Sequence, residues 1–168
     1  MKINNLQIII IYIYRKFLQI IMDLTIRKTE RADLSAVLGL VTELAVFENE
    51  PDAVTASLSD YEQAFDKGLI FGHVATLGSE VVGMTLCYEA WSTWKGRMMY
   101  LDDFYVKQAH RSKGIGDKLF DAMVEESRNR NCVLIKWQVL DWNTKAMRFY
   151  ERKKAELETN WYNVKLWL

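Results

Sequence analysis

The segment that most constrains the fold is a short basic loop with two glycines, His-Arg-Ser-Lys-Gly-Ile-Gly at residues 110–116. It follows an apolar, β-rich run at residues 98–106 and precedes a helical pattern at residues 117–131. The first N–H groups of a helix have no partner inside the helix, and the helix dipole adds positive charge there. Because Gly114 and Gly116 carry no Cβ, the backbone can approach a ligand closely. The sequence therefore predicts a phosphate or pyrophosphate site.

The surroundings of the loop make this prediction more specific, because two glycines alone also suit an ordinary basic turn. The pattern Arg-x-x-Gly-x-Gly at residues 111–116 directly follows Leu-Asp-Asp-Phe-Tyr-Val at residues 101–106. Together they resemble the acyl-CoA-binding motif of the GNAT acetyltransferase superfamily. Residues 141–143 and 148–152 resemble the next motif of that superfamily. The likeness is greatest to its diamine branch, the spermidine/spermine and thialysine acetyltransferases, and runs from about Leu24 to the C-terminus.

Hydrophobic periodicity and turn residues predict the elements. Asp33 is expected to cap the first helix, Gly68 to end the second, and residues 77–80 to form a hairpin turn. The order β-α-α-β-β-β-α-β-α-β-β predicts an α/β (α+β) domain with one mixed sheet. The resemblance implies the GNAT fold, a mostly antiparallel sheet flanked by helices, with splayed fourth and fifth strands. Strands are expected at residues 24–28, 70–76, 81–88, 98–106, 132–140, near 157 and at 164–168; helices are expected from Asp33, at 57–66 and 117–131, and from Asn143.

Length and charge limit the function. The 168 residues suit one domain, which we expect to span residues 22–168. Lysine plus arginine equals aspartate plus glutamate at 22 each, which argues against a nucleic-acid or membrane-surface binder. Cys87 and Cys132 have no metal-ligand or redox spacing, so we expect buried free thiols and a cytoplasmic protein. Residues 1–21 are interpreted as a leader of uncertain status, and a membrane-anchoring helix is the alternative.

Acetyl transfer to an amine needs a bound cofactor, a deprotonated amine and a proton for the departing thiolate. The resemblance implies acetyl-CoA as the donor, and no residue pattern predicts a metal or a covalent intermediate. Asn143 resembles the family residue beside the pantetheine arm, and it also suits a helix N-cap. The other cofactor-binding residues that the loop and the resemblance imply are Phe104, Tyr105, Val106, Arg111, Ser112, Lys113, Gly114, Ile115 and Gly116.

Two residues are candidates for catalysis. Tyr150 resembles the family's general acid, and a phenol of ordinary pKa near 10 keeps its proton at neutral pH; a core aromatic is the alternative. Asp102 stands where the diamine branch carries a proton-accepting glutamate, so it needs a water relay. Asp103 matches a branch aspartate linked to acceptor binding. Neighbouring strand residues point to opposite faces, so the two aspartates can share one pocket only at a β-bulge. Their alternative role is as solubility charges at a strand edge.

The acceptor site departs from the polyamine pattern. Polyamine members carry an aspartate two residues before a loop tryptophan; here Trp94 is kept, but Ser92 occupies the acidic position. Trp94 and Trp91 could line the pocket by cation–π contact or simply pack the loop. The carboxylates that could replace the missing one are Glu48, Glu50 and Glu89.

The expected function is acetyl transfer to a small diamine, polyamine or lysine-like amino acid. The alternatives are a protein, peptide or aminoglycoside-like acceptor, and a non-catalytic acyl-CoA-binding module, which would need neither Tyr150 nor Asp102. The resemblance also implies a homodimer, and the apolar C-terminal end, residues 161–168, suits such an interface.

Overall fold

The computed structural model describes residues 23–167; residues 1–22, which include the predicted leader, and residue 168 lie outside the described part. The described residues divide into two compact units, the first ending at Trp137 and the second beginning at Gln138. Within residues 23–167 there is no helix whose length and apolar character would let it cross a membrane.

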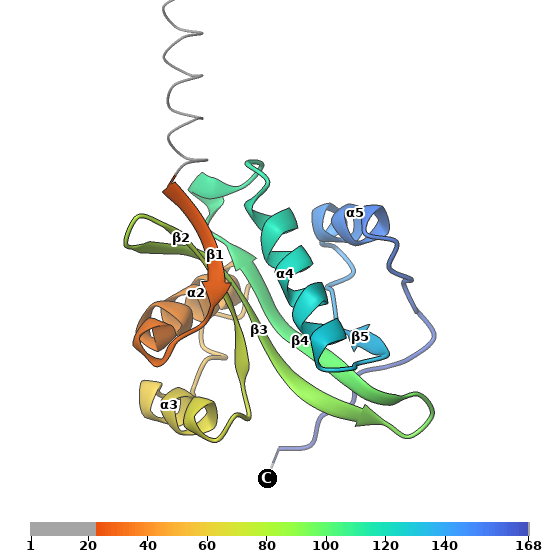
Figure 1. Cartoon of the computed structure of the whole chain (residues 1–168). Coiled ribbons are helices and arrows are strands. Elements are labelled where there is room, and N and C mark those ends of the chain that lie inside the picture. The colour runs from red at the N-terminus through yellow and green to blue at the C-terminus, as the bar shows by residue number, and fades with distance from the viewer. Residues whose placement is uncertain (1–22, 168) are drawn as a thin grey trace, which may run out of the picture. The chain divides into compact units, whose positions relative to one another are not determined.

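The first unit contains a five-stranded mixed sheet (Figure 1). The first four strands pair antiparallel in sequence order, and the fifth lies parallel to the fourth. The strands are β1 (Leu24–Lys28), β2 (Phe71–Leu77), β3 (Glu80–Ser92), β4 (Gly96–Val106) and β5 (Leu134–Lys136). The helices of this unit are α2 (Leu34–Phe47), α3 (Leu58–Asp66) and α4 (Ile115–Asn129), with short 3₁₀ turns η1 (Arg31–Asp33) and η2 (Gln108–His110).

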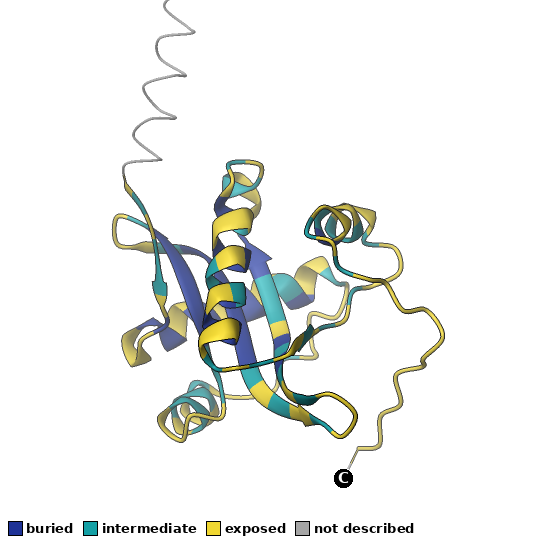
Figure 2. Cartoon of the chain, turned by 45° about the vertical axis from the view of Figure 1, so that its right-hand side comes forward, coloured by how far each residue is buried: buried dark blue, intermediate teal, exposed yellow. Residues whose placement is uncertain are grey.

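Helices cover both faces of the sheet, with α2 on one face and α4 on the other (Figure 1). Successive strand residues point to opposite faces, so each strand supplies both layers, and the central strands are buried (Figure 2). The α2 layer takes Val74, Met84, Leu86 and Tyr105 from the strands; the α4 layer takes Ala75, Val82 and Val106.

The fourth and fifth strands pair over three residues only. Met98 to Tyr100 of β4 pair with Leu134 to Lys136 of β5, and residues 101–106 of β4 pair with β3 alone. A short parallel contact followed by separation is the splay expected of the fold, so the predicted fold class is confirmed. The expected strand at residues 132–140 is wrong in length, because only residues 134–136 are strand.

The predicted helix ends are mostly confirmed. The Ser57 side chain accepts a hydrogen bond from the Asp60 N–H and caps α3. Gly68 follows α3 with φ 67°, as a left-handed C-terminal residue should. Asp33 occupies the position before α2, but its carboxylate makes no cap bond to that helix. It accepts instead from Arg27, at 2.6 and 2.8 Å, and from the Glu30 N–H.

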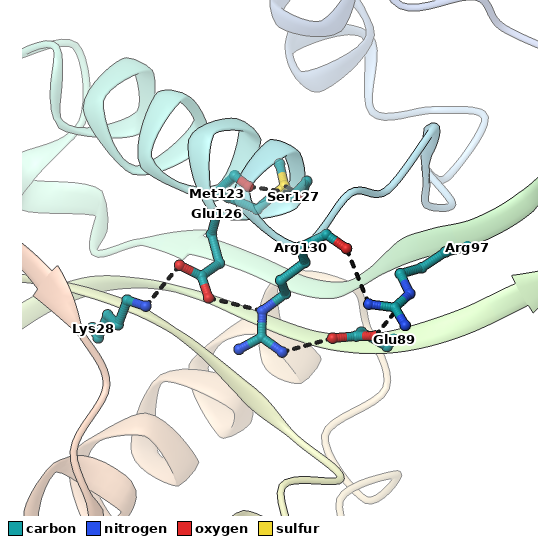
Figure 3. Close-up of polar contacts among 7 residues, drawn as sticks. All are labelled: Lys28, Glu89, Arg97, Met123, Glu126, Ser127 and Arg130. Atoms are coloured by element: carbon teal, nitrogen blue, oxygen red, sulfur yellow. Dashed lines mark hydrogen bonds and ion pairs between the residues drawn. The ribbon is translucent and has the colours of Figure 1, made fainter.

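Charged residues tie the C-terminal end of α4 to the sheet (Figure 3). Glu126 contacts Lys28 of β1 at 2.8 Å and Arg130 at 2.7 Å. Arg130 also contacts Glu89 of β3 at 2.7 Å, and Glu89 lies 3.7 Å from Arg97 of β4. Burial acts to raise the pKa of Glu126, but hydrogen bonds from Lys28 and Arg130 outweigh it and the pKa is lowered. The network therefore holds α4 against three strands.

The second unit contains α5 (Thr144–Arg152), and the residues after it carry no strand through residue 167. The strands expected near residue 157 and over the described part of 164–168 are therefore wrong. A strand needs the backbone of a partner, and this unit offers none. The apolar side chains of the segment are exposed, from 67% at Trp161 to 96% at Tyr162.

Candidate active site

The basic loop leaves β4 at Val106, passes through η2 and enters α4 at Ile115. Ser112 and Gly114 have φ of 61° and 77°, in the left-handed region, whereas Lys113 between them does not. Such alternation makes a concave nest of N–H groups that suits an anion. Among the described residues, the N–H groups of Ser112, Lys113 and Gly114 have no backbone acceptor. The loop and the start of α4 therefore present open donors at a helix N-terminus.

The two basic side chains of the loop are held by neighbouring groups. Lys113 Nζ donates to the Ala109 carbonyl at 2.8 Å. Arg111 Nε donates to the Val106 carbonyl at 2.8 Å. The Arg111 guanidinium also lies 5.0 Å from the ring centroid of Phe47 and 5.0 Å from that of Tyr105. No local pattern could single out Phe47 beforehand, because Phe47 and Arg111 lie more than 60 positions apart in the sequence.

Replacing Gly114 with valine should greatly weaken acetyl-CoA binding and leave the fold intact. A β-branched residue strains the backbone at φ 77° and covers the nest, yet a Cβ there meets no atom within 4 Å. Isothermal calorimetry with acetyl-CoA measures the effect. Gly78→Val is the matched control, since Gly78 has φ 57° and equal space in the β2–β3 turn. If wild type and Gly114→Val bound acetyl-CoA with equal affinity, the loop would not be part of the cofactor site.

A β-bulge in β4 places two aspartates side by side. Leu86 pairs with Asp103 and Cys87 with Leu101, so Asp102 is the extra residue. This irregularity confirms the bulge that the two aspartates required. Gly72 of β2 pairs with Leu86 beside the bulge. A Cβ on Gly72 would lie 1.8 Å from the Thr85 carbonyl oxygen, so β2 and β3 approach closely there.

An acidic cluster forms at this bulge from Asp102, Asp103 and Glu48, the residue that follows α2. Burial, followed by the charges of Asp102 and Glu48, raises the pKa of Asp103 to about 7. Partial burial of its carboxylate also raises the pKa of Asp102, although the residue as a whole is exposed. Burial raises the pKa of Glu48. Tyr61 of α3 faces the same charges, and burial together with Asp103 and Asp102 raises its pKa to about 12.

The pKa of Asp103 makes a test by pH possible. Below pH 7 the cluster loses one negative charge and attracts a cationic acceptor less strongly. We expect kcat/KM for the acceptor to rise with pH through an inflection near 7, and Asp103→Asn to lack that inflection. Asp52→Asn, at an exposed loop position, serves as the control. An inflection that persists in Asp103→Asn would assign it to another group.

The predicted acceptor residues of the β3–β4 hairpin lie away from this cluster. Ser92 ends β3, and its Oγ accepts from the Lys95 N–H at 3.1 Å. Trp94 is 82% exposed. Ser92 lies five positions along β3 from Cys87 at the bulge, which corresponds to about 17 Å. Glu89 belongs to the ion network of α4, so Glu48 is the candidate carboxylate that joins the aspartates.

The remaining two candidates lie on α5 of the second unit. Asn143 Oδ1 accepts from the Ala146 N–H at 3.2 Å, which confirms Asn143 as the N-cap. Tyr150 is the buried residue of this helix, and its ring centroid lies 5.5 Å from that of Phe149. The roles of both residues toward a cofactor remain predictions.

Residues 38–154, more than half of the chain, match the family model described as the acetyltransferase (GNAT) family. The chain belongs to the GNAT acetyltransferase family. GNAT enzymes take the acetyl group from acetyl-CoA, so the predicted enzyme class and donor are confirmed. The chain is 35% identical to the Bos taurus thialysine N-epsilon-acetyltransferase over 141 residues, which cover 78% of this chain and 83% of that one. It is 30% identical to the protein of the same name from Caenorhabditis elegans over 115 residues, covering 68% and 72%.

Solved GNAT structures support the fold. An aminoglycoside acetyltransferase from an uncultured soil metagenomic sample, solved with trehalose, superposes with a TM-score of 0.75 at 18% identity. The match covers 86% of this chain and 97% of that structure. The first unit of this GNAT enzyme thus brings together the anion nest, Arg111 and the acidic cluster, whereas Ser92 and Trp94 lie at the hairpin tip.

Proposed function

We propose that this GNAT enzyme acetylates a primary amine of a lysine-like amino acid or short diamine. The observation that carries the proposal is the β4 bulge, which places Asp102 and Asp103 beside Glu48. Three carboxylates at one point attract an ammonium group and can take its proton. The relatives named thialysine N-epsilon-acetyltransferase, 35% identical in Bos taurus and 33% in Sus scrofa, support a lysine-like acceptor.

The proposal assigns acetyl-CoA to the nest and the adjoining strand. The open N–H groups at residues 112–114 and at the start of α4 bind the pyrophosphate. Residues 104–106 lie where β4 has no β5 partner, so their backbone can pair with the pantetheine arm as a strand would. The backbone of the strand-end and loop residues from Phe104 to Gly116, together with Asn143, therefore keeps the cofactor roles that the resemblance implies.

The reaction proceeds by direct attack. The acceptor loses a proton to Asp102 through a water relay, and its nitrogen then attacks the thioester carbonyl carbon. The C–N bond forms, the C–S bond breaks, and the coenzyme A thiolate leaves with the bonding electron pair. Tyr150 gives the thiolate a proton, and the acetylated nitrogen releases its remaining extra proton, which restores the Tyr150 phenol through solvent. The products are the acetamide and free coenzyme A. No covalent enzyme intermediate is needed.

A thiol-release assay tests this function. The full chain is incubated with acetyl-CoA and separately with lysine, thialysine, short diamines, spermidine, spermine, an aminoglycoside and a peptide. We expect release of coenzyme A with lysine-like amino acids and short diamines, with mass spectrometry showing one added acetyl group. Turnover confined to the peptide or the aminoglycoside would contradict the proposed acceptor class. Binding of acetyl-CoA without turnover of any amine would favour a non-catalytic module.

Ser92 should set the preference against long polyamines. The serine offers no charge for a distal ammonium at the hairpin tip, and a charge-assisted contact is worth roughly 1.5–3 kcal/mol. We therefore expect kcat/KM to favour lysine over spermine by about tenfold or more. Ser92→Asp should raise kcat/KM for spermine alone, and its carboxylate can still accept from the Lys95 N–H, which preserves the turn. Ser92→Asn is the uncharged control. Equal changes for both acceptors would exclude position 92 as the determinant.

The proposal includes a homodimer and a cytoplasmic location. Exposed apolar side chains on the C-terminal segment support the dimer, since large apolar surfaces mark protein contacts. The cytoplasmic location is supported by two free thiols, of which Cys87 is buried and Cys132 half-buried. Sedimentation of the full chain tests the assembly. The residues that support the dimer are Trp161, Tyr162, Val164, Leu166 and Trp167.

A further inference from the structure

An open pocket of about 340 Å³ lies between the end of α2 and the basic loop. Its wall is largely apolar and aromatic, and it carries one cation and one carboxylate. The function described so far uses neither the pocket nor its carboxylate. The lining residues are Thr42, Glu43, Val46, Phe47, Tyr105, Gln108 and Arg111.

The cation of this pocket is held in place from three sides. The Arg111 guanidinium lies 5.0 Å from the ring centroids of Phe47 and Tyr105, and its Nε donates to the Val106 carbonyl. Stacking and this one hydrogen bond reduce the rotamer freedom of the side chain. A guanidinium ordered in this way presents a planar fork of donors, whose geometry matches a carboxylate.

The carboxylate of the pocket lies near the same phenol as the cation. Burial raises the pKa of Tyr105, the Arg111 cation acts to lower it, and the Glu43 carboxylate acts to raise it. Both charged groups therefore lie close to the Tyr105 hydroxyl. Glu43 is exposed on α2, so it can also reach a ligand. A positive and a negative group near the same hydroxyl suit a zwitterion.

The pocket adjoins the acidic cluster along two elements. Tyr105 follows Asp103 by two residues, so both side chains project from the same face of β4 about 6.6 Å apart. That spacing is comparable to the four-carbon stem of a lysine side chain. Phe47, on the other wall, directly precedes Glu48. An extended lysine-like molecule can therefore place its two ends in the pocket and at the cluster.

We propose that this pocket binds the amino-acid head of the acceptor, with Arg111 holding the α-carboxylate and Glu43 the α-ammonium. The inference rests on the proposed function and narrows its substrate class to free lysine-like amino acids. The distal amine then reaches Asp103 and Asp102 at the bulge. The Arg111 side chain thus serves the acceptor, while the N–H groups of Ser112 to Gly114 serve the cofactor.

Three acceptors that differ only in the head group test the pocket. Lysine carries both groups, 1,5-diaminopentane lacks the carboxylate, and 6-aminohexanoate lacks the α-amine. With wild type at saturating acetyl-CoA, we expect kcat/KM for lysine to exceed each of the others by about tenfold or more. Arg111→Gln should lower the values for lysine and 6-aminohexanoate and spare 1,5-diaminopentane. Glu43→Gln should lower the values for lysine and 1,5-diaminopentane and spare 6-aminohexanoate.

Controls and a binding assay make the result decisive. Glu125→Gln, an exposed change on the opposite helix α4, should alter no acceptor. A raised acetyl-CoA KM in Arg111→Gln with unchanged ratios between acceptors would assign this side chain to the cofactor and overturn the proposal. If no amine is turned over, the proposed function fails, and calorimetry with lysine and coenzyme A still tests the pocket. Equal affinity for lysine and 1,5-diaminopentane in that assay would also overturn it.

Discussion

Replacing Tyr150 with phenylalanine is expected to lower kcat by about 10²–10⁴-fold, the usual range for general acid–base help. The substitution removes the hydroxyl that is proposed to donate the proton, and it keeps the buried aromatic ring of α5. Because phenylalanine preserves this packing, the acetyl-CoA KM should change much less than kcat. Steady-state kinetics with lysine and acetyl-CoA, together with single-turnover rates, separate the chemical step from product release.

Tyr162→Phe is the matched control for this experiment. Tyr162 lies in the same unit and is 96% exposed. Phenylalanine keeps the apolar ring that the proposed dimer contact uses, so the loss of the hydroxyl alone should leave kcat unchanged. A Tyr150→Phe enzyme as fast as wild type, with chemistry shown to be rate-limiting, would make Tyr150 a packing residue of α5 and leave the thiolate to be protonated by solvent.

Replacing Gly72 with alanine is expected to destabilise the fold by about 3 kcal/mol or more, which is a large part of the stability of a typical domain. The new Cβ would lie 1.8 Å from the Thr85 oxygen and 2.8 Å from the Thr85 carbonyl carbon. Both atoms are backbone, so relief requires β2 and β3 to separate beside the bulge. Urea unfolding followed by tryptophan fluorescence gives the change in the free energy of unfolding.

Replacing Gly39 with alanine serves as the control, and it is expected to raise the free energy of unfolding. Gly39 lies in α2, and a Cβ there meets no atom within 4 Å. Alanine costs a helix about 0.5–1 kcal/mol less than glycine, so Gly39→Ala should stabilise the protein by that amount. A Gly72→Ala protein with the stability of wild type would show that the two strands are not so close at the bulge.

The parts of the fold that local sequence determines could be predicted. Strands β2 and β3, the hairpin turn between them and the end of α3 at Gly68 all depend on neighbours in sequence, and the structure confirms them. The late strands could not be predicted correctly, because alternation along residues 157–167 says nothing about a partner backbone. Strand pairing is a property of two segments, and the second unit supplies only one.

In the candidate site, too, some features follow from the local sequence and others depend on how distant segments pack. Gly114 at φ 77° follows from the residue type, because glycine adopts the left-handed region readily. Ser112 at φ 61° does not, since serine rarely adopts it. The charge of Arg111 was visible in the sequence, but its stacking on Phe47 depends on how α2 packs. Likewise, the two adjacent aspartates required a bulge if both were to face one pocket, whereas the part played by Glu48 required the end of α2 to meet β4.

The ion network at the far end of α4 has a mechanical consequence. Lys28, Glu89 and Arg97 hold that end through Glu126 and Arg130, so the helix has a fixed point there. When a ligand binds at the N-terminal end of α4, the helix can move only by a small rotation about its fixed C-terminal end. We therefore expect the arrival of a phosphate to displace the first turn most and the strands hardly at all. Capture of the donor then leaves the carboxylates at the bulge undisturbed and ready for the second substrate.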